Sequence, residues 1–392
     1  MYRKFKADQL FNGHEFLPAG TVLITDTNGV IIDIIDTKNA GDNIEVFNGI
    51  LTPGFINAHC HLELSHLKGI LPEATGLVTF VQQVMAKRNA GEDEKLQAMQ
   101  KAEEELYKGG IVAVGDICNT ADSILIKQKS NIYWHNFIEV SGFTDSLAEK
   151  RFFDAKQVAS QFSIDNCQLS IVPHAPYSVS KTLFKLLNDA TPEKLITIHN
   201  QETAAEDELY KNKQGGFLDL YKNFNIDISA FQATHKSSLQ TWFPYFANHQ
   251  SIILVHNTFI NKEDIDFIKI QNSKFKSENF FCICINANKY IEKKTPPINL
   301  LRENSCTLVI GTDSYASNWQ LNMLEEIKTI QKEMPDISLA EILRWATING
   351  AKALQIDDRF GSFEKGKQPG LVLIDKIENS NITTASSAKR IL

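Results

Sequence analysis

The sequence has no long apolar run, because none of its apolar stretches approaches the ~20 residues that a membrane helix needs. Its opening residues, MYRKFKADQLFNG, also lack the apolar centre of a signal peptide. Basic residues are not in excess, since 40 Lys and Arg face 47 Asp and Glu and leave a formal net charge of −7. The composition therefore predicts a cytoplasmic protein and gives no reason to expect a membrane or a nucleic acid as partner.

Cysteine is sparse as well. Six cysteines are scattered over 392 residues, and in the absence of a secretion signal we expect free thiols. The one close pair, Cys282 and Cys284, lacks the second Cys or His pair of a structural zinc site. The P-C-x-x-C element that accompanies H-x-E in the base-flipping zinc deaminases is also absent, so editing of nucleic acid is not expected.

Short apolar runs that end in a polar or histidine-containing step alternate with longer amphipathic stretches. This alternation indicates a parallel sheet covered by helices, and eight runs fit a (β/α)8 TIM barrel of the α/β class. A doubly wound open sheet is the alternative, but its usual Gly-rich phosphate loop is missing. The eight runs cover residues 50–59, 111–117, 131–140, 168–174, 195–199, 251–256, 280–286 and 307–313.

The two ends of the chain follow another pattern. Residues 1–49 alternate with a period of two and turn at Asn-Gly and other Gly steps, which is typical of antiparallel strands. After a helix expected at about 338–355, residues 361–375 return to the strand pattern. We therefore predict one small β-domain from residues 1–50 and 358–392, beside a barrel domain at 51–357.

Histidine is concentrated at the carboxyl ends of the predicted strands. Four of the eight runs carry histidine at or near that end, and the last run ends in Asp313. Active sites of (β/α)8 barrels are built at this face, so the clustering predicts a functional site. The histidines concerned are His59, His61, His174, His199 and His256.

His59 and His61 form the strongest single signal for a metal. Residues i and i+2 of a strand point the same way, so both imidazoles can face the barrel axis and ligate one ion at about 2.0–2.1 Å. Hydrogen bonding of both rings to backbone groups is the competing interpretation. Backbone hydrogen bonding would be the better interpretation of either histidine alone. For a pair of histidines at a strand end, metal ligation is the better interpretation.

Two acids accompany the histidines. Glu202, in the step HNQE, can approach a metal-activated water only if the strand stops at His199 and Glu202 lies in the following turn. The competing interpretation is an acid in the first turn of the next helix. Asp313 follows an apolar strand, where a buried carboxylate needs a cation or donors, and a helix N-cap is its alternative. The residue pattern allows three roles for His256 and His174: a metal ligand, a substrate contact or a hydrogen-bonded core residue.

The steps PGFINAHCH, VPHAPYS, HNQE, LVHNTF, GTDSYASN and the closing ATINGAKAL and FGSFEKGKQPGLVLID occur in this order over nearly the whole chain. Together they resemble the amidohydrolase superfamily, and within it the metal-dependent deaminases and chlorohydrolases that act on adenosine derivatives, guanine and triazines. The resemblance implies a barrel flanked by a small β-sandwich from both termini.

The resemblance also implies roles for these residues. The metal ligands would be His59, His61, His199 and Asp313. Asp313 would in addition accept a proton, Glu202 would shuttle a proton to a ring nitrogen, and His256 would hydrogen-bond the attacking oxygen or the leaving group. Binuclear members carry a carboxylated lysine where the fourth strand here ends at His174, so one divalent ion is expected, Zn2+ in the first place and Fe2+ as the alternative. His174 would contact the substrate.

The chain departs from the family's pattern in two places. The usual Cys-Pro-x-Ser-Asn after the seventh strand is replaced by Cys284-Ile285-Asn286-Ala287-Asn288. Relatives that deaminate S-adenosylhomocysteine use arginines after the third strand, where only Arg151 lies nearby, so that substrate is less expected. The step HLELSHLKG resembles deaminases of aminodeoxyfutalosine, and Glu63 within it is expected to contact the substrate.

The predicted function is hydrolytic deamination, at a C–N bond, of a purine or adenine nucleoside-type small molecule, of which an aminodeoxyfutalosine-like compound is one candidate. The first alternative keeps the metal and hydrolyses another cyclic amide or amidine, or a carbon–halogen bond. The second is a catalytically silent barrel that binds a ligand. Partners other than a small molecule are not expected, apart from a second copy in a homodimer.

Overall fold

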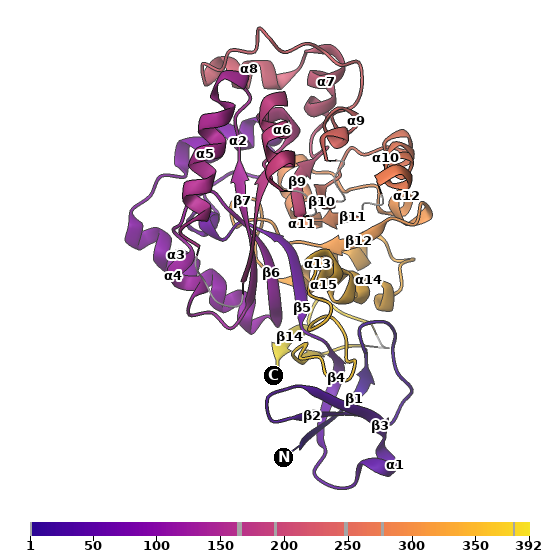
Figure 1. Ribbon diagram of the computed structural model, residues 1–392. Coiled ribbons are helices and arrows are strands. Elements are labelled where there is room, and N and C mark those ends of the chain that lie inside the picture. Colours follow the sequence, from indigo (N-terminus) through magenta and orange to yellow (C-terminus); the bar gives the residue numbers. More distant parts are fainter. Residues whose placement is uncertain (1, 163–166, 192–193, 247–249, 276–277, 379–380) are drawn as a thin grey trace.

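The structure is a computed structural model that describes residues 2–162, 167–191, 194–246, 250–275, 278–378 and 381–392. All eight predicted parallel strands are present, in two four-stranded sheets of order β5-β6-β7-β8 and β12-β11-β10-β9 (Figure 1). The strands are β5 (Phe55–Cys60), β6 (Ile111–Cys118), β7 (Tyr133–Val140), β8 (Cys167–Pro173), β9 (Leu195–Asn200), β10 (Ser251–His256), β11 (Asn279–Ile283) and β12 (Thr307–Ile310).

Two seams join these sheets into a closed cylinder. At the first seam the backbone N–H of His199 donates to the carbonyl of His174 at 3.0 Å and joins β9 to the end of β8. At the second, the N–H groups of Thr312 and Asp313 donate to the carbonyl of His59 at 3.1 and 3.0 Å and join the end of β12 to β5. The predicted (β/α)8 barrel is therefore confirmed, and residues of the predicted site form both seams.

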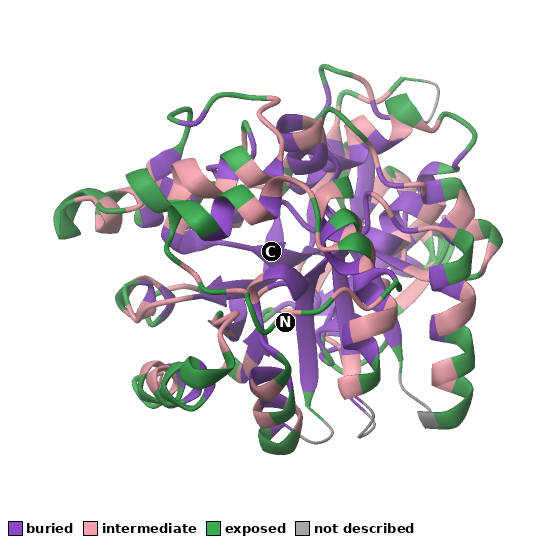
Figure 2. Cartoon of the chain, turned by 90° about the horizontal axis from the view of Figure 1, so that it is seen from above, coloured by how far each residue is buried: buried purple, intermediate pink, exposed green. Residues whose placement is uncertain are grey.

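Helices surround the barrel. Seen from above in Figure 2, the strands are buried, while the helices around them are buried on one side and exposed on the other. This is the pattern expected when each helix buries one apolar face on a parallel sheet. The helices of this layer and of the barrel mouth are α2 (Leu77–Lys87), α3 (Glu92–Lys108), α4 (Ile124–Lys127), α5 (Ala148–Ala159), α6 (Lys181–Ala190), α7 (Ala204–Asn212), α8 (Gly216–Asn223), α9 (Ser238–Trp242), α10 (Lys262–Phe275), α11 (Ile285–Glu292), α12 (Ile298–Glu303), α13 (Met323–Glu333), α14 (Leu339–Ala346) and α15 (Ile348–Ala353).

Three predicted element boundaries were wrong. The first apolar run breaks at Pro53, which lacks a backbone N–H, so β4 (Glu45–Thr52) ends before it and β5 begins after it. The seventh run is a strand only to Ile283, because its last residues begin α11. The single helix expected at about 338–355 is two helices, α14 and α15, which meet at Thr347 with φ −128° and ψ −96°.

The terminal sheet contains strands from both ends of the chain, as predicted, in the order β14-β13-β4-β1-β2-β3. Figure 1 shows it below the barrel, next to the amino end of β5. One expectation was wrong: β1 pairs with β4 in parallel, while its other strand pairs are antiparallel. The domain limits at 50/51 and 357/358 stay predictions. The remaining elements are β1 (Tyr2–Leu10), β2 (Thr21–Asp26), β3 (Ile31–Asp36), α1 (Thr37–Ala40), β13 (Val372–Asp375) and β14 (Ser387–Arg390).

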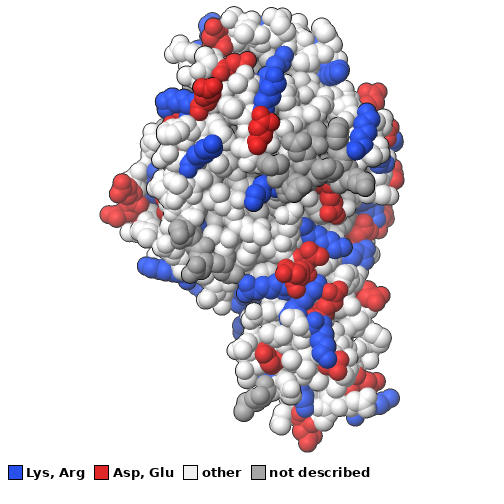
Figure 3. Space-filling view, in the orientation of Figure 1, with Lys and Arg blue, Asp and Glu red and all other residues white. Residues whose placement is uncertain are grey.

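The state of the cysteines and the distribution of surface charge agree with what the composition predicted. All six cysteines are free. Acidic and basic side chains are interspersed on the face drawn in Figure 3. Within the described part of the chain, every helix is too short or too polar to cross a bilayer.

Gly311, directly after β12, allows the closest packing beside the predicted site. A Cβ at this position would lie 2.8 Å from the Cβ of His59, 2.9 Å from Sγ of Cys282 and 3.0 Å from Sγ of Cys284. We expect Gly311→Ala to lower the free energy of unfolding by about 1–3 kcal/mol and to displace His59. Urea unfolding measures the first effect and bound metal the second. Gly91→Ala, where no atom lies within 4 Å, is the control and should change stability by less than about 0.5 kcal/mol. Equal stability of the two variants would contradict the packing argument.

Candidate metal and catalytic site

The cluster begins at the end of β5. His59 is the penultimate residue of β5, and His61 follows the strand at the start of a 3-10 turn, η1 (Leu62–Leu67). Their Nε2 atoms are 3.1 Å apart, and both side chains are buried. The two imidazoles therefore face each other at the barrel mouth, as the i, i+2 spacing predicted.

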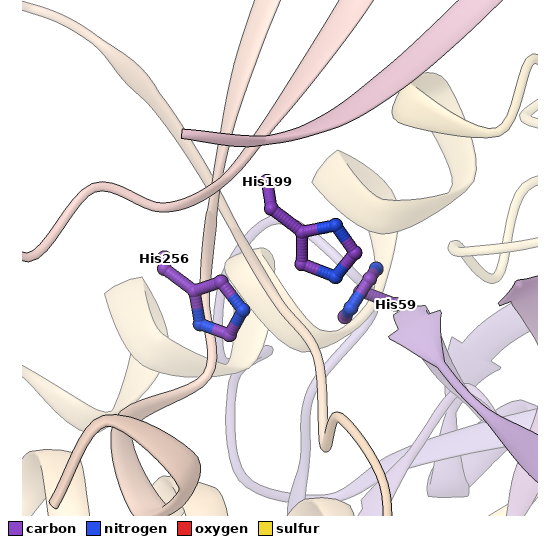
Figure 4. A group of neighbouring side chains, drawn as sticks. All are labelled: His59, His199 and His256. Carbon is purple, nitrogen blue, oxygen red and sulfur yellow. The ribbon is translucent and has the colours of Figure 1, made fainter. Parts of the chain in front are cut away.

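Two further histidines complete the group from the opposite sheet. His199 on β9 places its Nε2 atom 3.2 Å from Nε2 of His61. His59, His199 and His256 each offer a nitrogen within 4.8 Å of the others. Figure 4 shows these three rings converging from different strands. The second seam adds the carboxylate of Asp313, whose Oδ1 lies 3.6 Å from Nε2 of His59 and 3.4 Å from Nε2 of His61.

The backbone around the cluster is held in an uncommon conformation. Asp313, His256 and Asn257 have φ angles of 58°, 73° and 56°, a region that costs of order 1–3 kcal/mol for residues other than glycine. The seam hydrogen bonds to His59 hold Asp313 in place, and its Oδ2 accepts a hydrogen bond from Ser317 at 2.7 Å. The side chains of Asp313 and His256 thus reach the cluster from backbone that is held in this conformation.

The donor set fits one divalent cation. Burial lowers the pKa values of His59, His61 and His199, so these rings are neutral near pH 7. His199 gives its Nδ1 proton to the carbonyl of His174 at 2.8 Å, which leaves the lone pair of Nε2 facing His61. Tetrahedral ligands at about 2.0–2.1 Å from one ion lie about 3.3–3.4 Å apart, close to the observed Nε2 separations of 3.1 and 3.2 Å.

Glu202 lies beside this group in the turn after β9, which ends at Asn200. Its carboxyl is buried, and Oε1 lies 3.6 Å from Nε2 of His256. Burial, together with the nearby Asp313, raises the pKa of Glu202 well above its usual range. The shift favours the protonated carboxyl, which suits Glu202 to act as an acid.

The altered step after β11 contacts this site. Asn288 directs its amide nitrogen to Nδ1 of His256 at 3.4 Å and to the hydroxyl of Thr258. Asn286 donates from its backbone N–H and its amide to Glu326 at 3.1 and 2.9 Å. The amide of Asn288 therefore helps to orient His256 even though the proline and serine of the family pattern are missing.

A cavity of about 790 Å3, its open mouth included, opens onto the cluster. His174 lines it from the end of β8, and burial lowers the pKa of His174 to about 4, so the ring is neutral. The cavity is also lined by five of the other predicted site residues, namely His61, His199, Glu202, His256 and Asp313.

Glu63 has surroundings different from those expected of a substrate contact. Its buried carboxylate accepts hydrogen bonds from the backbone N–H groups of Asn119 and Thr120, both at 3.1 Å. It is not among the residues that line the cavity. Burial raises the pKa of Glu63 to about 7. These contacts make Glu63 a link between η1 and the loop after β6, and its role toward the substrate stays a prediction.

The sequence analysis missed two acids at this end of the barrel. Glu139, near the end of β7, lines the cavity, with Oε1 3.5 Å from Nδ1 of His199. Asp116 on β6 accepts a hydrogen bond from the N–H of Leu62 at 2.8 Å and forms a buried ion pair with Lys127 at 2.5 Å. A signal was present for Asp116, because it interrupts a strand that is otherwise apolar, whereas β7 also contains His135 and Asn136 and so does not single out Glu139.

The barrel, the converging imidazoles and the buried carboxyl together define a metal-dependent hydrolase. Over residues 50–391 the chain matches the Amidohydrolase family, and it therefore belongs to that family. It lies in the branch of deaminases and chlorohydrolases and is a hydrolase of carbon–nitrogen bonds. The resemblance noted from the motifs is thereby confirmed.

Individual relatives are distant but cover most of the chain. Adenosine deaminase of Helicobacter pylori is 27% identical over 332 residues, 83% of this chain and 78% of its own. Helicobacter pylori aminofutalosine deaminase in complex with methylthio-coformycin has a TM-score of 0.82 at 24% identity and covers 100% of both chains. An adenosine deaminase from Xanthomonas campestris with bound zinc has a TM-score of 0.72 at 22% identity, with 95% of this chain and 84% of its own covered.

The ion pair of Lys127 with Asp116 generates a stability prediction. Both side chains are fully buried, and Lys127 also donates to Oδ1 of Asn136 at 2.7 Å. We expect Lys127→Met to lower the free energy of unfolding by about 3–5 kcal/mol, because it leaves the Asp116 carboxylate buried without its cation. Adding Asp116→Asn should recover part of this loss. Urea unfolding of the two single variants and the double variant measures the coupling.

Lys129→Met is the matched control. Lys129 is exposed at the end of the same turn, and its replacement should change stability by less than about 0.5 kcal/mol. A double variant as unstable as the sum of its parts would show that the pair does not act as a unit.

Proposed function

We propose that this protein is a hydrolytic deaminase of adenine nucleosides that uses one divalent cation. The observation that carries the proposal is a cluster of possible metal ligands beside the buried carboxyl of Glu202, onto which one cavity opens. The ligands are His59, His61, His199 and Asp313. A ligand-binding barrel without activity would need neither a complete ligand set nor a protonated acid next to it. The proposal also includes the expectations of a cytoplasmic location and a homodimer.

His59, His61, His199 and Asp313 would hold the cation, with Zn2+ as the first choice and Fe2+ as the alternative. When bound, such a cation lowers the pKa of water and so supplies a nucleophile near neutral pH. The zinc found in the Xanthomonas campestris relative supports the choice of metal. A single cation is favoured because binuclear members of the family carry a carboxylated lysine at the end of this strand, where this chain has the neutral imidazole of His174. Nδ1 of His174 lies 2.6 Å from the hydroxyl of Ser178.

The two acids have opposite tasks. Asp313 accepts a proton from the attacking water. Although burial works against ionisation, its polar surroundings, which include His61, His256 and the hydroxyl of Ser317, hold its pKa below the usual value. Glu202 gives its proton to the ring nitrogen next to the carbon that bears the amino group. Water then adds to that carbon. The proton taken up by Asp313 passes to the amino group, which leaves as ammonia, and the added hydroxyl returns a proton to Glu202 as the carbonyl forms. His256, 3.6 Å from Glu202, would hydrogen-bond the attacking oxygen.

The substrate class is supported by the relatives, two of which are named adenosine deaminases and one aminofutalosine deaminase. At 22–27% identity these names indicate an adenine nucleoside and leave its substituents open. The direct test is ammonia release from adenosine, 5'-deoxyadenosine, guanine and cytosine. We expect release from the adenine nucleosides alone. Hydrolysis of a cyclic amide or a chlorotriazine without ammonia release from any amine would overturn the proposal.

Removal of the metal provides a second test. Dialysis against a chelator should abolish ammonia release, and one equivalent of Zn2+ or Fe2+ per chain should restore it, because the four ligands surround one position. Metal content per chain is measured alongside activity. Full activity after the metal has been removed, or a requirement for two equivalents, would contradict the single-cation site.

Replacement of Glu202 tests the proton transfer separately. Glu202→Gln keeps the size of the side chain but removes the acid, so kcat should fall by about 10²–10⁴-fold while metal content stays unchanged. Glu208→Gln on the exposed face of α7 is the control and should retain wild-type turnover. If Glu202→Gln turned over at the wild-type rate, Glu202 would have no part in the reaction.

A further inference from the structure

The turn between β9 and α7 carries Glu202 and is built around Gln201. Gln201 directly follows β9, it is buried, and its φ angle is 45°. That conformation costs about 1–3 kcal/mol for a residue other than glycine and persists only where the surroundings hold it. The contacts of Gln201 should therefore show what fixes this turn and, with it, the position of Glu202.

Two buried carboxyl groups hold Gln201, and each lies in the first turn of a helix. The backbone N–H of Gln201 donates to Oε1 of Glu206 in α7 at 3.0 Å. Its side-chain amide donates from Nε2 to Oδ2 of Asp264 in α10 at 2.7 Å. Both acids are buried. Because a hydrogen bond to a buried carboxyl group is costly to break, the backbone and the side chain of Gln201 are both fixed.

The amino end of helix α9 supports both carboxyl groups. The hydroxyl of Ser237, the N-cap of α9, donates to Oδ1 of Asp264 at 2.5 Å. The hydroxyl of Ser238 donates to Oε1 of Glu206. Helix α9 packs against both α7 and α10. The positions of the two acceptors therefore do not depend on Gln201 alone.

Gln201 also connects the turn that carries Glu202 to the segment after the neighbouring strand. Its carbonyl accepts the N–H of Phe259 at 2.9 Å. Phe259 follows β10, which ends at His256. Oε1 of Glu202 lies 3.6 Å from Nε2 of His256. The separation of these two site residues thus depends on where Gln201 is held.

We propose that Glu206 and Asp264 are positioning residues for the proton transfer. By holding Gln201, they set the direction in which the next side chain, that of Glu202, enters the cavity. This inference rests on the proposed function, because it concerns the acid of that reaction. Neither Glu206 nor Asp264 is among the residues that line the cavity. Misplacing a catalytic group by about 1 Å can cost about 10²-fold in rate, so loss of either acceptor should lower kcat.

Two other roles for these acids make different predictions. Acids in the first turn of a helix can be stabilising through the helix dipole alone, and their removal would then change stability but not kcat. Glu206 could also act by its charge. Burial is the main cause of the raised pKa of Glu202, and the charge of Glu206 adds to it. If this charge were the role of Glu206, Glu206→Gln and Glu206→Ala would act alike.

The first test compares these two variants, with kcat and KM for adenosine measured on metal-loaded protein. Glu206→Ala removes the acceptor, and we expect kcat to fall by about 10–100-fold while KM changes by less than about threefold. Glu206→Gln keeps a carbonyl oxygen for the N–H of Gln201, so its kcat should stay within about threefold of the wild type. Burial raises the pKa of Glu206 to about 8, so a neutral group is already compatible with this place.

The second test shows whether Glu206 acts through Glu202. In the background of Glu202→Gln the acid is already lost, so adding Glu206→Ala should lower kcat by less than about twofold. Independent effects would instead multiply. Asp264→Ala should lower kcat as Glu206→Ala does and should likewise have little further effect in this background.

Gln201→Gly provides a variant that keeps the backbone conformation. Glycine adopts a φ angle of 45° readily, so stability should be largely kept, but the bond to Asp264 is lost and the turn is freer. We expect kcat to fall by about 3–30-fold at unchanged metal content. Glu263→Ala is the matched control, because Glu263 is the exposed acid next to Asp264 in the first turn of α10. It should leave kcat and KM unchanged.

The proposal is overturned if Glu206→Ala and Asp264→Ala lower stability while kcat of the metal-loaded protein stays unchanged. It is also overturned if Glu206→Gln loses as much activity as Glu206→Ala, or if Glu206→Ala slows the Glu202→Gln protein by the same factor as the wild type. Wild-type kcat in Gln201→Gly would overturn it even if the alanine variants failed to fold.

Other results bear on the proposed function instead. Wild-type turnover by Glu202→Gln, or no ammonia release from any adenine nucleoside, would overturn the proposed function. The two failures are therefore distinguishable.

Discussion

The site depends on the hydrogen bonds that close the barrel. The carbonyl of His59 accepts the N–H groups of Thr312 and Asp313, and this brings the last strand's carboxylate against the first strand's imidazoles. The same bonds hold Asp313 at a positive φ that an aspartate in a free loop would rarely adopt. Closure of the sheet and assembly of the ligand set are therefore a single event, and anything that opens this seam removes the metal site as well.

Opposite electrostatic surroundings let two neighbouring carboxyl groups do different chemistry. Asp313 faces imidazoles and accepts a hydroxyl donor, so its ionised form is favoured. For Glu202, burial is the main effect and nearby acids, among them Asp313 itself, add to it, so its neutral form is favoured. A base and an acid can thus act at one cavity at the same pH, because the fold separates their pKa values.

The sequence was sufficient for the features that depend on local pattern. The eight strands were predictable because apolar runs alternate with amphipathic stretches, and the cluster because each strand places its last side chains at one face. Features that depend on long-range packing could not be predicted from the sequence. The parallel pairing of β1 with β4 and the direction of the Glu63 carboxylate are set by loops whose course the pattern does not encode. Arg88 directly follows α2, and only the folding of α2 over the barrel mouth brings it to the cavity.

The terminal sheet has a practical consequence for work with this enzyme. Both ends of the described chain lie in that sheet, which sits at the amino ends of the barrel strands (Figure 1). The cavity opens at the carboxyl ends of the same strands, on the other side of the cylinder. An affinity handle or a surface tether attached at either terminus would hold the molecule with its entrance facing the solution, so immobilised protein should still admit its ligand.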